Sequence, residues 1–452
     1  MKIIVVGCGK IGTAIIKNLV KEGHDVTVMD TDRKTVDEVS NVYDVIGVVG
    51  NGADYDTLAE ADASKTDVLV AATGSDELNM LSCFVAKRMG VGHTIARIRN
   101  PEYNDKNSAF MKQQLGISLS INPELFAAQE MFNILKLPSV INIETFSRRN
   151  FEMVELLIKN DSSVNGMSLI ELRKKFQGNY LICVVQRENE VIIPDGNFVL
   201  RDGDRIGLTA ESNEIQKLLK GLGLLKKSAR NVTVLGAGRV SYYLTKMLLS
   251  SGNSVKVIDN DPKVCEEFSN ALPEALVVNG DGSEQEVLLE EGIDSTDAFV
   301  ALTGMDEENI LISFFAAAHN VPKIITKINR YELSDMASKL GLECIINPKD
   351  IIADIVSGYV RALQNSIGSN IETLYKLMNG KAEAAEFNVQ TDFRYTGIPI
   401  KDLKLKKNIL IAGIIRGRKS IIPSGDDAIF AADRVVVIGA GMQLNDLNDI
   451  FE

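Results

Sequence analysis

GCGKIGTAI, residues 7–15, follows a short run of β-branched residues and opens a segment in which apolar residues recur at helical spacing. Its glycines, Gly7, Gly9 and Gly12, form the Gly-x-Gly-x-x-Gly pattern of a strand–turn–helix that binds dinucleotides. This pattern alone is a weak indicator. Asp30, at the end of the next predicted strand, strengthens it, because an acidic residue at this place accepts hydrogen bonds from the adenosine ribose.

Each glycine of the motif has a physical role. Gly7 permits the tight turn, Gly9 lets a pyrophosphate approach the amides at the helix N-terminus, and Gly12 allows the helix to pack closely on the strand. The carboxylate of Asp30 also disfavours a 2′-phosphate, which argues against NADP. The alternative is that the glycines only shape a turn. The other residues of this segment predicted to contact the nucleotide are Cys8, Lys10, Ile11 and Thr31.

The motif recurs in the second half of the chain as GAGRVSYYL, residues 236–244. Gly236 and Gly238 keep the two positions that face phosphate, and Asp259 keeps the ribose acceptor. Ser241 replaces the third glycine. Because that glycine serves mainly helix–strand packing, we expect the serine to shift the helix slightly without closing the second site. Arg239 and Val240 complete the predicted contacts of this loop.

Two further segments of each copy are expected at the carboxyl edge of the sheet, where ligands bind in open α/β folds. Arginines at the end of the fifth strand suit a pyrophosphate or the terminal phosphate of ATP, although they could instead pair with carboxylates. In the first copy these residues are Thr73, Gly74, Asp76, Arg97 and Arg99, and in the second copy Thr303, Gly304 and Lys327. Asn329 stands where the first copy has Arg99.

The repeat extends over the whole chain and predicts four domains in the order A–B–A–B. VIIPDGNFVLRDGDRIGL from Val191, for example, matches SIIPSGDDAIFAADRVVVI from Ser420. Continuous Val/Ile-rich runs between helix-length segments predict that each A domain is a doubly wound parallel sheet, and hairpin turns predict that each B domain is a small α+β module. The predicted domains are residues 1–140, 141–225, 226–368 and 369–452, with a hinge at LLKKSAR from Leu224.

A helix that starts with Asn-Pro lies between each A and B domain. Pro123 and Pro348 occupy the first helical position, and a wide apolar stripe follows in the second helix. Such a helix either covers its own sheet or crosses over to a partner domain. Glu124 suits the helix dipole in the first turn, and Lys349 replaces it in the second copy.

Composition narrows the class of protein. The 452 residues carry 61 acidic and 49 basic side chains, and the net charge of −12 argues against nucleic-acid binding. Five scattered cysteines predict reduced core thiols, and the absence of a long apolar run predicts a soluble cytosolic protein. The three histidines lie at helix-to-strand turns away from the glycine loops, so we predict no catalysis and no metal site.

Taken together, these motifs resemble the RCK (KTN) family in the tandem form of TrkA-type regulatory subunits of Trk potassium uptake systems. The resemblance implies NAD(H) and ATP or ADP as ligands. It also implies a homodimer or homotetramer that forms a ring, and a cytoplasmic, peripheral location under a TrkH- or TrkG-like membrane subunit. A regulator of a potassium efflux or cation/proton antiporter, or an NAD-dependent oxidoreductase, are the alternatives.

Overall fold

The computed structural model describes residues 1–100, 103, 108–136, 140–146, 151–159, 162–221, 229–366, 371–378, 380–442, 444 and 446–452. The predicted hinge at Leu224 and the predicted boundaries at 225 and 368 lie outside these residues. The chain forms two compact units. The first combines Met1–Met131 with Asn231–Val360, and the second combines Phe132–Arg230 with Arg361–Glu452. Like parts of the repeat therefore pair with each other.

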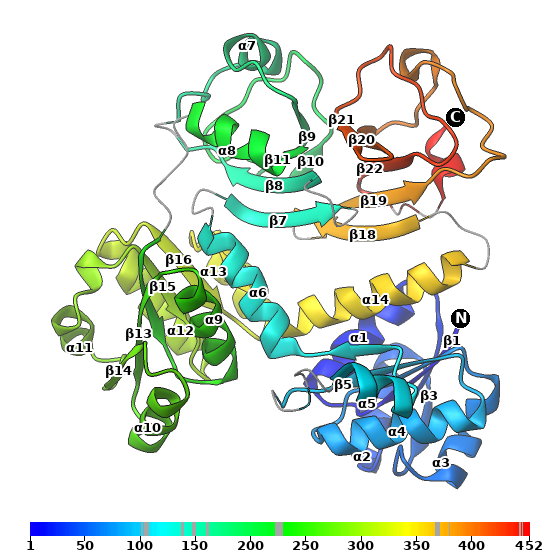
Figure 1. The fold of residues 1–452 in the computed structure, drawn as a ribbon, viewed down its shortest axis with the longest axis vertical. Helices are drawn as coiled ribbons and strands as arrows, with labels where there is room; N and C mark the ends of the chain where they lie inside the picture. Colours follow the sequence, from blue (N-terminus) through cyan, green and yellow to red (C-terminus); the bar gives the residue numbers. More distant parts are fainter. Residues whose placement is uncertain are drawn as a thin grey trace. The chain divides into compact units, whose positions relative to one another are not determined.

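The first unit begins with a Rossmann-type sheet, drawn in blue and cyan in Figure 1. Its parallel strands are β1 (Lys2–Val6), β2 (Asp25–Asp30), β3 (Ile46–Val49), β4 (Val68–Ala71), β5 (His93–Arg97) and β6 (Leu119–Ile121). Its helices are α1 (Lys10–Lys21), α2 (Arg33–Tyr43), α3 (Tyr55–Glu60), α4 (Asp76–Met89) and α5 (Ser108–Leu115). The order β3-β2-β1-β4-β5-β6 places the switch point between β1 and β4, where such sheets bind ligands.

The second Rossmann-type sheet repeats this order as β14-β13-β12-β15-β16-β17. The strands are β12 (Asn231–Leu235), β13 (Ser254–Asp259), β14 (Leu276–Asn279), β15 (Ala298–Ala301), β16 (Lys323–Lys327) and β17 (Ile345–Ile346). The helices are α9 (Arg239–Ser250), α10 (Pro262–Ala271), α11 (Gln285–Glu290), α12 (Asp306–Ala318) and α13 (Tyr331–Lys339). The prediction of two doubly wound sheets is thus confirmed.

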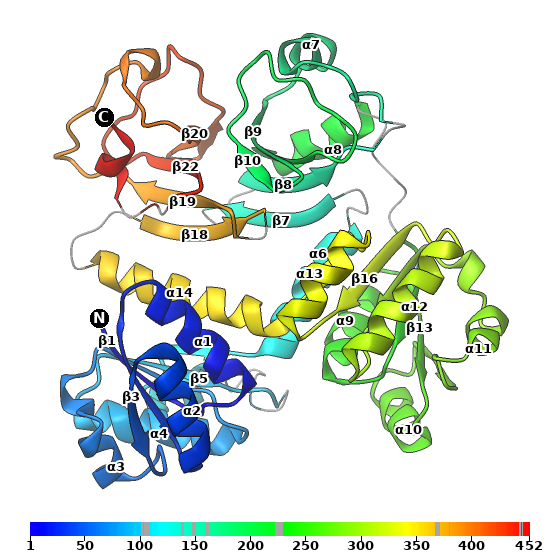
Figure 2. The same ribbon diagram turned by 180° about the vertical axis from the view of Figure 1, so that it is seen from behind.

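Burial on both faces explains the continuous apolar runs of the central strands. Every residue of β4 is buried, as is every residue of β15. In the first sheet α4 lies on the face turned to the viewer in Figure 1, and α1 and α2 lie on the opposite face, turned to the viewer in Figure 2. Ser75 caps the N-terminus of helix α4, and its side chain accepts from the N–H of Leu78. Gly90 caps the C-terminus with a φ of 108°. Gly90 suits this left-handed conformation.

The helices that begin with Asn-Pro are α6 (Pro123–Lys136) and α14 (Pro348–Ser366). Helix α14 of the second copy lies alongside the first copy in both Figure 1 and Figure 2. Asn18 Nδ2 donates to Asp354 Oδ1 over 2.9 Å, and the Tyr359 hydroxyl lies 3.3 Å from His93 Nδ1. Ile352, Val356 and Val360 of its apolar stripe are buried, so α14 crosses over to the other copy, as one of the two hypotheses predicted.

The second unit contains two antiparallel sheets with matching strand orders, β10-β9-β11-β8-β7 and β21-β20-β22-β19-β18. The first copy consists of β7 (Val140–Phe146), β8 (Phe151–Leu157), β9 (Tyr180–Arg187), β10 (Glu190–Ile192), β11 (Arg205–Glu211), α7 (Leu169–Lys175) and α8 (Ser212–Gly221). The second copy consists of β18 (Ile371–Leu377), β19 (Ala382–Asn388), β20 (Ile409–Arg416), β21 (Lys419–Ile421) and β22 (Arg434–Ala440). The α+β prediction is confirmed.

The two small sheets share one hydrophobic core. Phe151 of the first copy packs where a side chain on Gly413 of the second copy would lie, since a Cβ built there is 2.4 Å from the phenyl ring. Buried polar groups also pair across this core. Thr209 Oγ1 donates to the Ala412 carbonyl over 3.0 Å, and Glu155 accepts from the N–H of Met378 over 3.0 Å. No helix among the described residues has the length and apolar character needed to cross a membrane.

A half-buried carboxyl group, Glu130 on α6, lies close to Asp354 on α14. Burial, followed by the negative charge of Asp354, raises the pKa of Glu130 to about 7. A carboxyl group whose pKa is higher in the folded state opposes folding once it ionises. This penalty is absent below the unfolded pKa of about 4.3 and complete above about pH 7.

We therefore expect Glu130→Gln to raise the midpoint of thermal unfolding by a few °C at pH 8, because it removes the ionised group. At pH 4.5 the variant and the wild type should unfold together. Glu60→Gln, at an exposed position of α3, is the matched control and should change neither midpoint. An equal shift of the Glu130→Gln midpoint at both pH values would contradict the assignment.

Candidate nucleotide-binding site

The first two glycines of the two loops have matching backbone conformations. Gly7 and Gly236 have φ values of 95° and 96°, which favour glycine. A Cβ on Gly7 would lie 2.8 Å from the N atom of Thr73, and one on Gly236 would lie 3.0 Å from the carbonyl carbon of Leu302. The first glycine of each loop is therefore required by the turn and by the neighbouring strand end.

At the second glycine of each loop, neither the backbone conformation nor the neighbouring protein atoms require a glycine. Gly9 and Gly238 have φ values of −70° and −77°, which any residue adopts. A Cβ on either would meet no atom within 4 Å. Both begin a helix without a side-chain cap, so the first-turn N–H groups of α1 and α9 receive no hydrogen bond from the N-cap side chain. A ligand phosphate that approaches the backbone is a physical reason for glycine at these two positions.

An aspartate at the end of the second strand holds each loop. Asp30 Oδ2 accepts from the N–H of Cys8 over 2.7 Å, and Asp259 Oδ2 accepts from the N–H of Ala237 over the same distance. The other oxygen of each aspartate accepts from a backbone N–H two residues further along. A carboxylate offers about four acceptor positions, so capacity remains for ribose hydroxyls.

A single cavity of about 830 Å³ is lined by residues of both A copies. Its volume lies in the range of small-molecule sites. Of the residues predicted from the sequence, it is lined by Gly7, Gly9, Lys10, Ile11, Asp30, Thr31, Thr73, Gly74, Arg97, Gly238, Arg239, Val240 and Lys327. The two loops, far apart in the sequence, therefore open into one space.

Eight predicted residues do not line this cavity: Cys8, Gly12, Asp76, Arg99, Gly236, Asp259, Thr303 and Gly304. The cavity consequently includes the predicted ribose acceptor of the first copy but only the phosphate end of the second copy. Cys8 is buried, and this burial, followed by the charge of Asp30, raises the pKa of its thiol to about 12. All five cysteines are buried and free.

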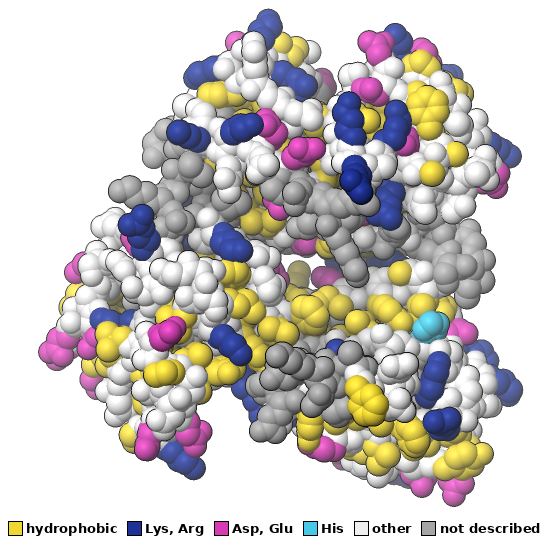
Figure 3. Space-filling model, viewed as in Figure 1, with side chains coloured by type: hydrophobic (Ala, Val, Ile, Leu, Met, Phe, Trp, Pro, Cys, Tyr) yellow, Lys and Arg dark blue, Asp and Glu magenta, His cyan; other side chains and the backbone are white. Residues whose placement is uncertain are grey.

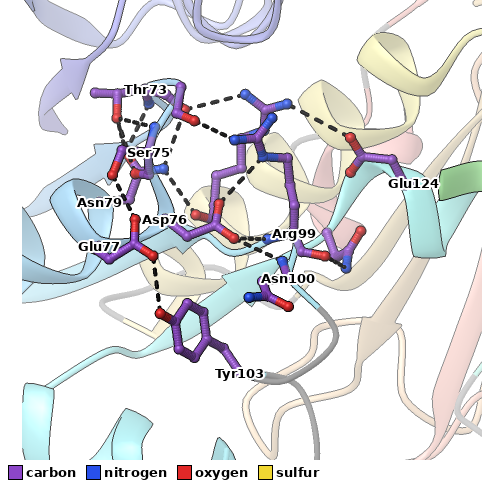
Figure 4. Close-up of polar contacts among 12 residues, drawn as sticks. Thr73, Ser75, Asp76, Glu77, Asn79, Arg99, Asn100, Tyr103 and Glu124 are labelled. Atoms are coloured by element: carbon purple, nitrogen blue, oxygen red, sulfur yellow. Dashed lines mark hydrogen bonds and ion pairs between the residues drawn. The ribbon is translucent and has the colours of Figure 1, made fainter. Parts of the chain in front are cut away.

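The two arginines at the end of β5 have different surroundings. Figure 4 shows Asp76 between the Thr73 turn and the segment of Arg99 and Asn100. Asp76 accepts from the backbone N–H groups of Arg99 and Asn100, each over 2.8 Å, and forms a 3.3 Å ion pair with Arg99 Nε. Asp76 and Arg99 thus fix the end of β5 and point at each other. The fork of Arg97 and Arg99 on a phosphate stays a prediction.

Arg97 is the arginine that reaches the cavity. Its Nη1 donates to the Thr73 carbonyl over 3.3 Å, and its Nη2 lies 3.9 Å from Glu124, the first-turn glutamate of α6. Its Nε has no hydrogen-bond partner and is buried. Burial lowers the pKa of Arg97, and the charges of Arg99 and Arg239 lower it further. Arg239 belongs to the second glycine loop, so a cation of each copy acts in the same space.

Sequence reasoning missed several residues of the cavity wall. One group follows the third strand, where Gly50 and Gly52 line the cavity. A Cβ on Gly52 would lie 2.2 Å from Val6 Cγ1, so packing against β1 requires this glycine. The repeat held a signal for it, because Gly280 and Gly282 follow the third strand of the second copy. The other missed positions are Val6, Ala72, Ser75, Leu78, Pro123, Leu302 and Pro348.

Fold, loop geometry and cavity define a protein with tandem Rossmann-type domains arranged for nucleotides. The TrkA-N domain model matches residues 3–123 and 232–348, and the TrkA-C domain model matches residues 153–223 and 384–452. The Trk system potassium uptake protein TrkA homolog of Archaeoglobus fulgidus is 32% identical over 451 residues, which is 100% of each chain. The chain therefore belongs to the TrkA family of Trk system potassium uptake proteins.

Solved structures support the fold. A GsuK channel bound to NAD has a TM-score of 0.64 and 16% identity, and covers 97% of this chain and 76% of its own. A GsuK structure bound to ADP has a TM-score of 0.51 and 14% identity, and covers 81% of this chain and 69% of its own. At these identities the likeness shows the fold alone.

The third glycine position separates the two copies. A Cβ on Gly12 would lie 1.8 Å from the Gly7 carbonyl oxygen, whereas Ser241 is buried with no hydrogen-bond partner for its hydroxyl. We expect Gly12→Ala to displace the first loop and to destabilise the fold by about 1–3 kcal/mol, as overpacking does. Ser241→Ala should change stability by less than about 1 kcal/mol. Urea unfolding of both variants checks the difference, and equal effects would contradict it.

Tyr243, on α9 of the second copy, reaches the first copy. Its hydroxyl donates to the Arg99 carbonyl over 3.2 Å and accepts from Asn122 Nδ2 over 3.1 Å. Tyr243→Phe should lower the free energy of unfolding by about 1 kcal/mol, the typical net value of such a bond. Tyr242→Phe, one residue away on the same helix, is the control and should have a smaller effect. The assignment fails if the two variants unfold at the same urea concentration.

Proposed function

We propose that the chain is a nucleotide-sensing regulatory subunit of a Trk-type potassium uptake system. The observation that carries the proposal is the second loop glycine. Gly9 has an ordinary φ and open space beside its Cα. It lies at the wall of a cavity that is lined by several lysine and arginine side chains. A phosphate-bearing ligand accounts for the glycine, for the uncapped helix and for the buried charge of Arg97 together.

In the proposed complex, an adenine nucleotide lies on the first loop. The ribose hydroxyls donate to Asp30, and the phosphates accept from the N–H groups at the start of α1. Arg97 and, from the second copy, Arg239 neutralise the phosphate charge. NAD(H) and ATP or ADP are the proposed ligands, since all carry the same adenosine. Two solved structures with this fold, both of GsuK, support this choice, since one is bound to NAD and the other to ADP.

We also propose a nucleotide position on the second loop, formed by Gly236, Gly238 and Asp259 with Thr303 and Gly304. The identical bond from each aspartate to its loop supports this position. The four domains, with the boundaries predicted from the sequence, would transmit ligand binding to a membrane subunit of the TrkH or TrkG kind. Two or four chains forming a ring on the cytoplasmic side is the proposed assembly. Family membership supports the link to potassium uptake.

Gly9→Val tests the first position directly. Valine adopts the Gly9 backbone conformation, but its side chain would occupy the place of the phosphate, so we expect a loss of ATP, ADP and NADH affinity of more than tenfold at this position. Calorimetric titration measures it. Gly238→Val is the matched variant of the second loop and should leave the Asp30 position intact. Unchanged binding in Gly9→Val, with unfolding like that of wild type, would overturn the proposal.

A change of ligand tests Asp30 without disturbing its bond to the loop. ADP and 2′,3′-dideoxy-ADP differ only in the ribose hydroxyls, so the dideoxy compound should bind about tenfold more weakly. Equal affinities would remove the ribose role from Asp30. For the regulatory role, potassium flux through vesicles containing the membrane subunit should respond to ATP, ADP or NADH with wild-type chain. It should lose that response with Gly9→Val.

A further inference from the structure

The charge of the cavity is concentrated at its second-copy end. On the surface seen in Figure 3, basic and acidic side chains of the described residues are interspersed, in keeping with a net charge of −12. The cavity wall instead carries five cations and two carboxylates. The carboxylates, Asp30 and Glu124, both belong to the first copy. The cations are Lys10, Arg97, Arg239, Lys327 and Lys349.

Two of these cations, Lys327 and Lys349, are half-buried and contact only carbonyl oxygens. Lys327 Nζ donates to the Leu302 carbonyl over 3.1 Å, and Lys349 Nζ donates to the Asn329 carbonyl over 2.7 Å. Among the described residues, no carboxylate oxygen lies within 4.0 Å of either ammonium group. Burial lowers the pKa of both lysines, and the charge of Lys10 lowers that of Lys349 further. An anion in the cavity would stabilise both charges.

The first copy has a glutamate at the position of Lys349, and this difference changes the charge of the cavity wall. There, the equivalents of Lys327 and Lys349 are Arg97 and Glu124, which form a 3.9 Å ion pair. A neutral pair in one copy therefore corresponds to two positive charges in the other. Like charges that share a site repel each other unless an anion lies between them.

The second loop adds further anion donors to this end of the cavity. Helix α9 starts there without a side-chain cap and without an acidic residue in its first turn. A Cβ on Gly238 would meet no atom within 4 Å, so open space lies beside the start of this helix. Arg239, the first residue of the helix, lines the same wall.

We propose that Lys327 and Lys349, together with Arg239 and the first turn of α9, form a second subsite for a di- or triphosphate group. The inference rests on the proposed function, because it assigns more phosphate chemistry to the same cavity. The lysines supply the positive charge that a carboxylate-bound divalent cation supplies elsewhere, so this subsite binds phosphate in the absence of Mg²⁺. The phosphate belongs either to a second nucleotide on the second loop or to the far end of a nucleotide on the first loop.

Calorimetric titration with inorganic tripolyphosphate in EDTA tests the subsite without an adenosine. We expect Lys349→Gln and Lys327→Met each to weaken binding about tenfold or more, because each removes a charge-assisted hydrogen bond. Lys349→Arg should restore most of the affinity. Lys339→Gln is the control, since Lys339 is exposed on α13 and pairs with Asp335 outside the cavity. Wild-type affinity in the double variant Lys327→Met/Lys349→Gln, or no binding to wild type in EDTA, would overturn the proposal.

Gly9→Val then identifies the source of the phosphate. If this variant still binds ATP and loses it when Lys349→Gln is added, the subsite serves a second nucleotide. If it binds tripolyphosphate but no ATP, the subsite serves the nucleotide of the first loop. AMP separates the two proposals: its affinity should fall in Gly9→Val and stay unchanged in Lys349→Gln. The subsite would be refuted, and the proposed function would stand, if AMP affinity fell in Gly9→Val while neither Lys349→Gln nor Lys327→Met changed the affinity for tripolyphosphate.

Discussion

The bond from an aspartate to the glycine loop is the interaction on which the binding site depends. The carboxylate of Asp30 holds the N–H of Cys8, and Asp259 holds that of Ala237, each over 2.7 Å. This hydrogen bond connects the residue after the first glycine of each loop to the end of the next strand. The turn, the start of the helix and the strand edge are thereby fixed relative to one another. In the proposed complex the same acidic side chain also accepts hydrogen bonds from the ribose.

The sequence was sufficient to predict the strands and the glycine loop of each copy. Buried strands leave a continuous apolar signal, and the turn at Gly7 leaves a glycine, so the two doubly wound sheets and the two loops were predictable. The pairing of Arg99 with Asp76 was not, because sequence spacing places both arginines at a strand end but does not say that Asp76 lies beside Arg99. The presence of Arg239 in a cavity with Arg97 could not be predicted either. A repeat shows that two segments are alike and carries no information on whether they face each other.

The tandem chain permits the two copies to differ where a symmetric pair of identical subunits could not. Lys349 stands in place of Glu124. The hydroxyl of Tyr243 forms a hydrogen bond to the other copy, whereas the first copy has Ala14 at this position and cannot form one. The two ends of one cavity therefore differ in charge, while the first two glycines of their loops keep the same backbone conformation. In the proposed function, the loop backbone supplies the affinity for phosphate, and the exchanged side chains determine what each end accepts.

The crossing of α14 has a consequence for synthesis of the chain on the ribosome. The buried residues Ile352, Val356 and Val360 complete a region that includes Asn18 and His93, which leave the ribosome far earlier. At about 5–20 residues per second, the first Rossmann domain waits on the order of ten seconds or more for its covering helix. During that interval the surface that α14 covers in the folded protein is exposed on the nascent chain, where it can associate with other chains.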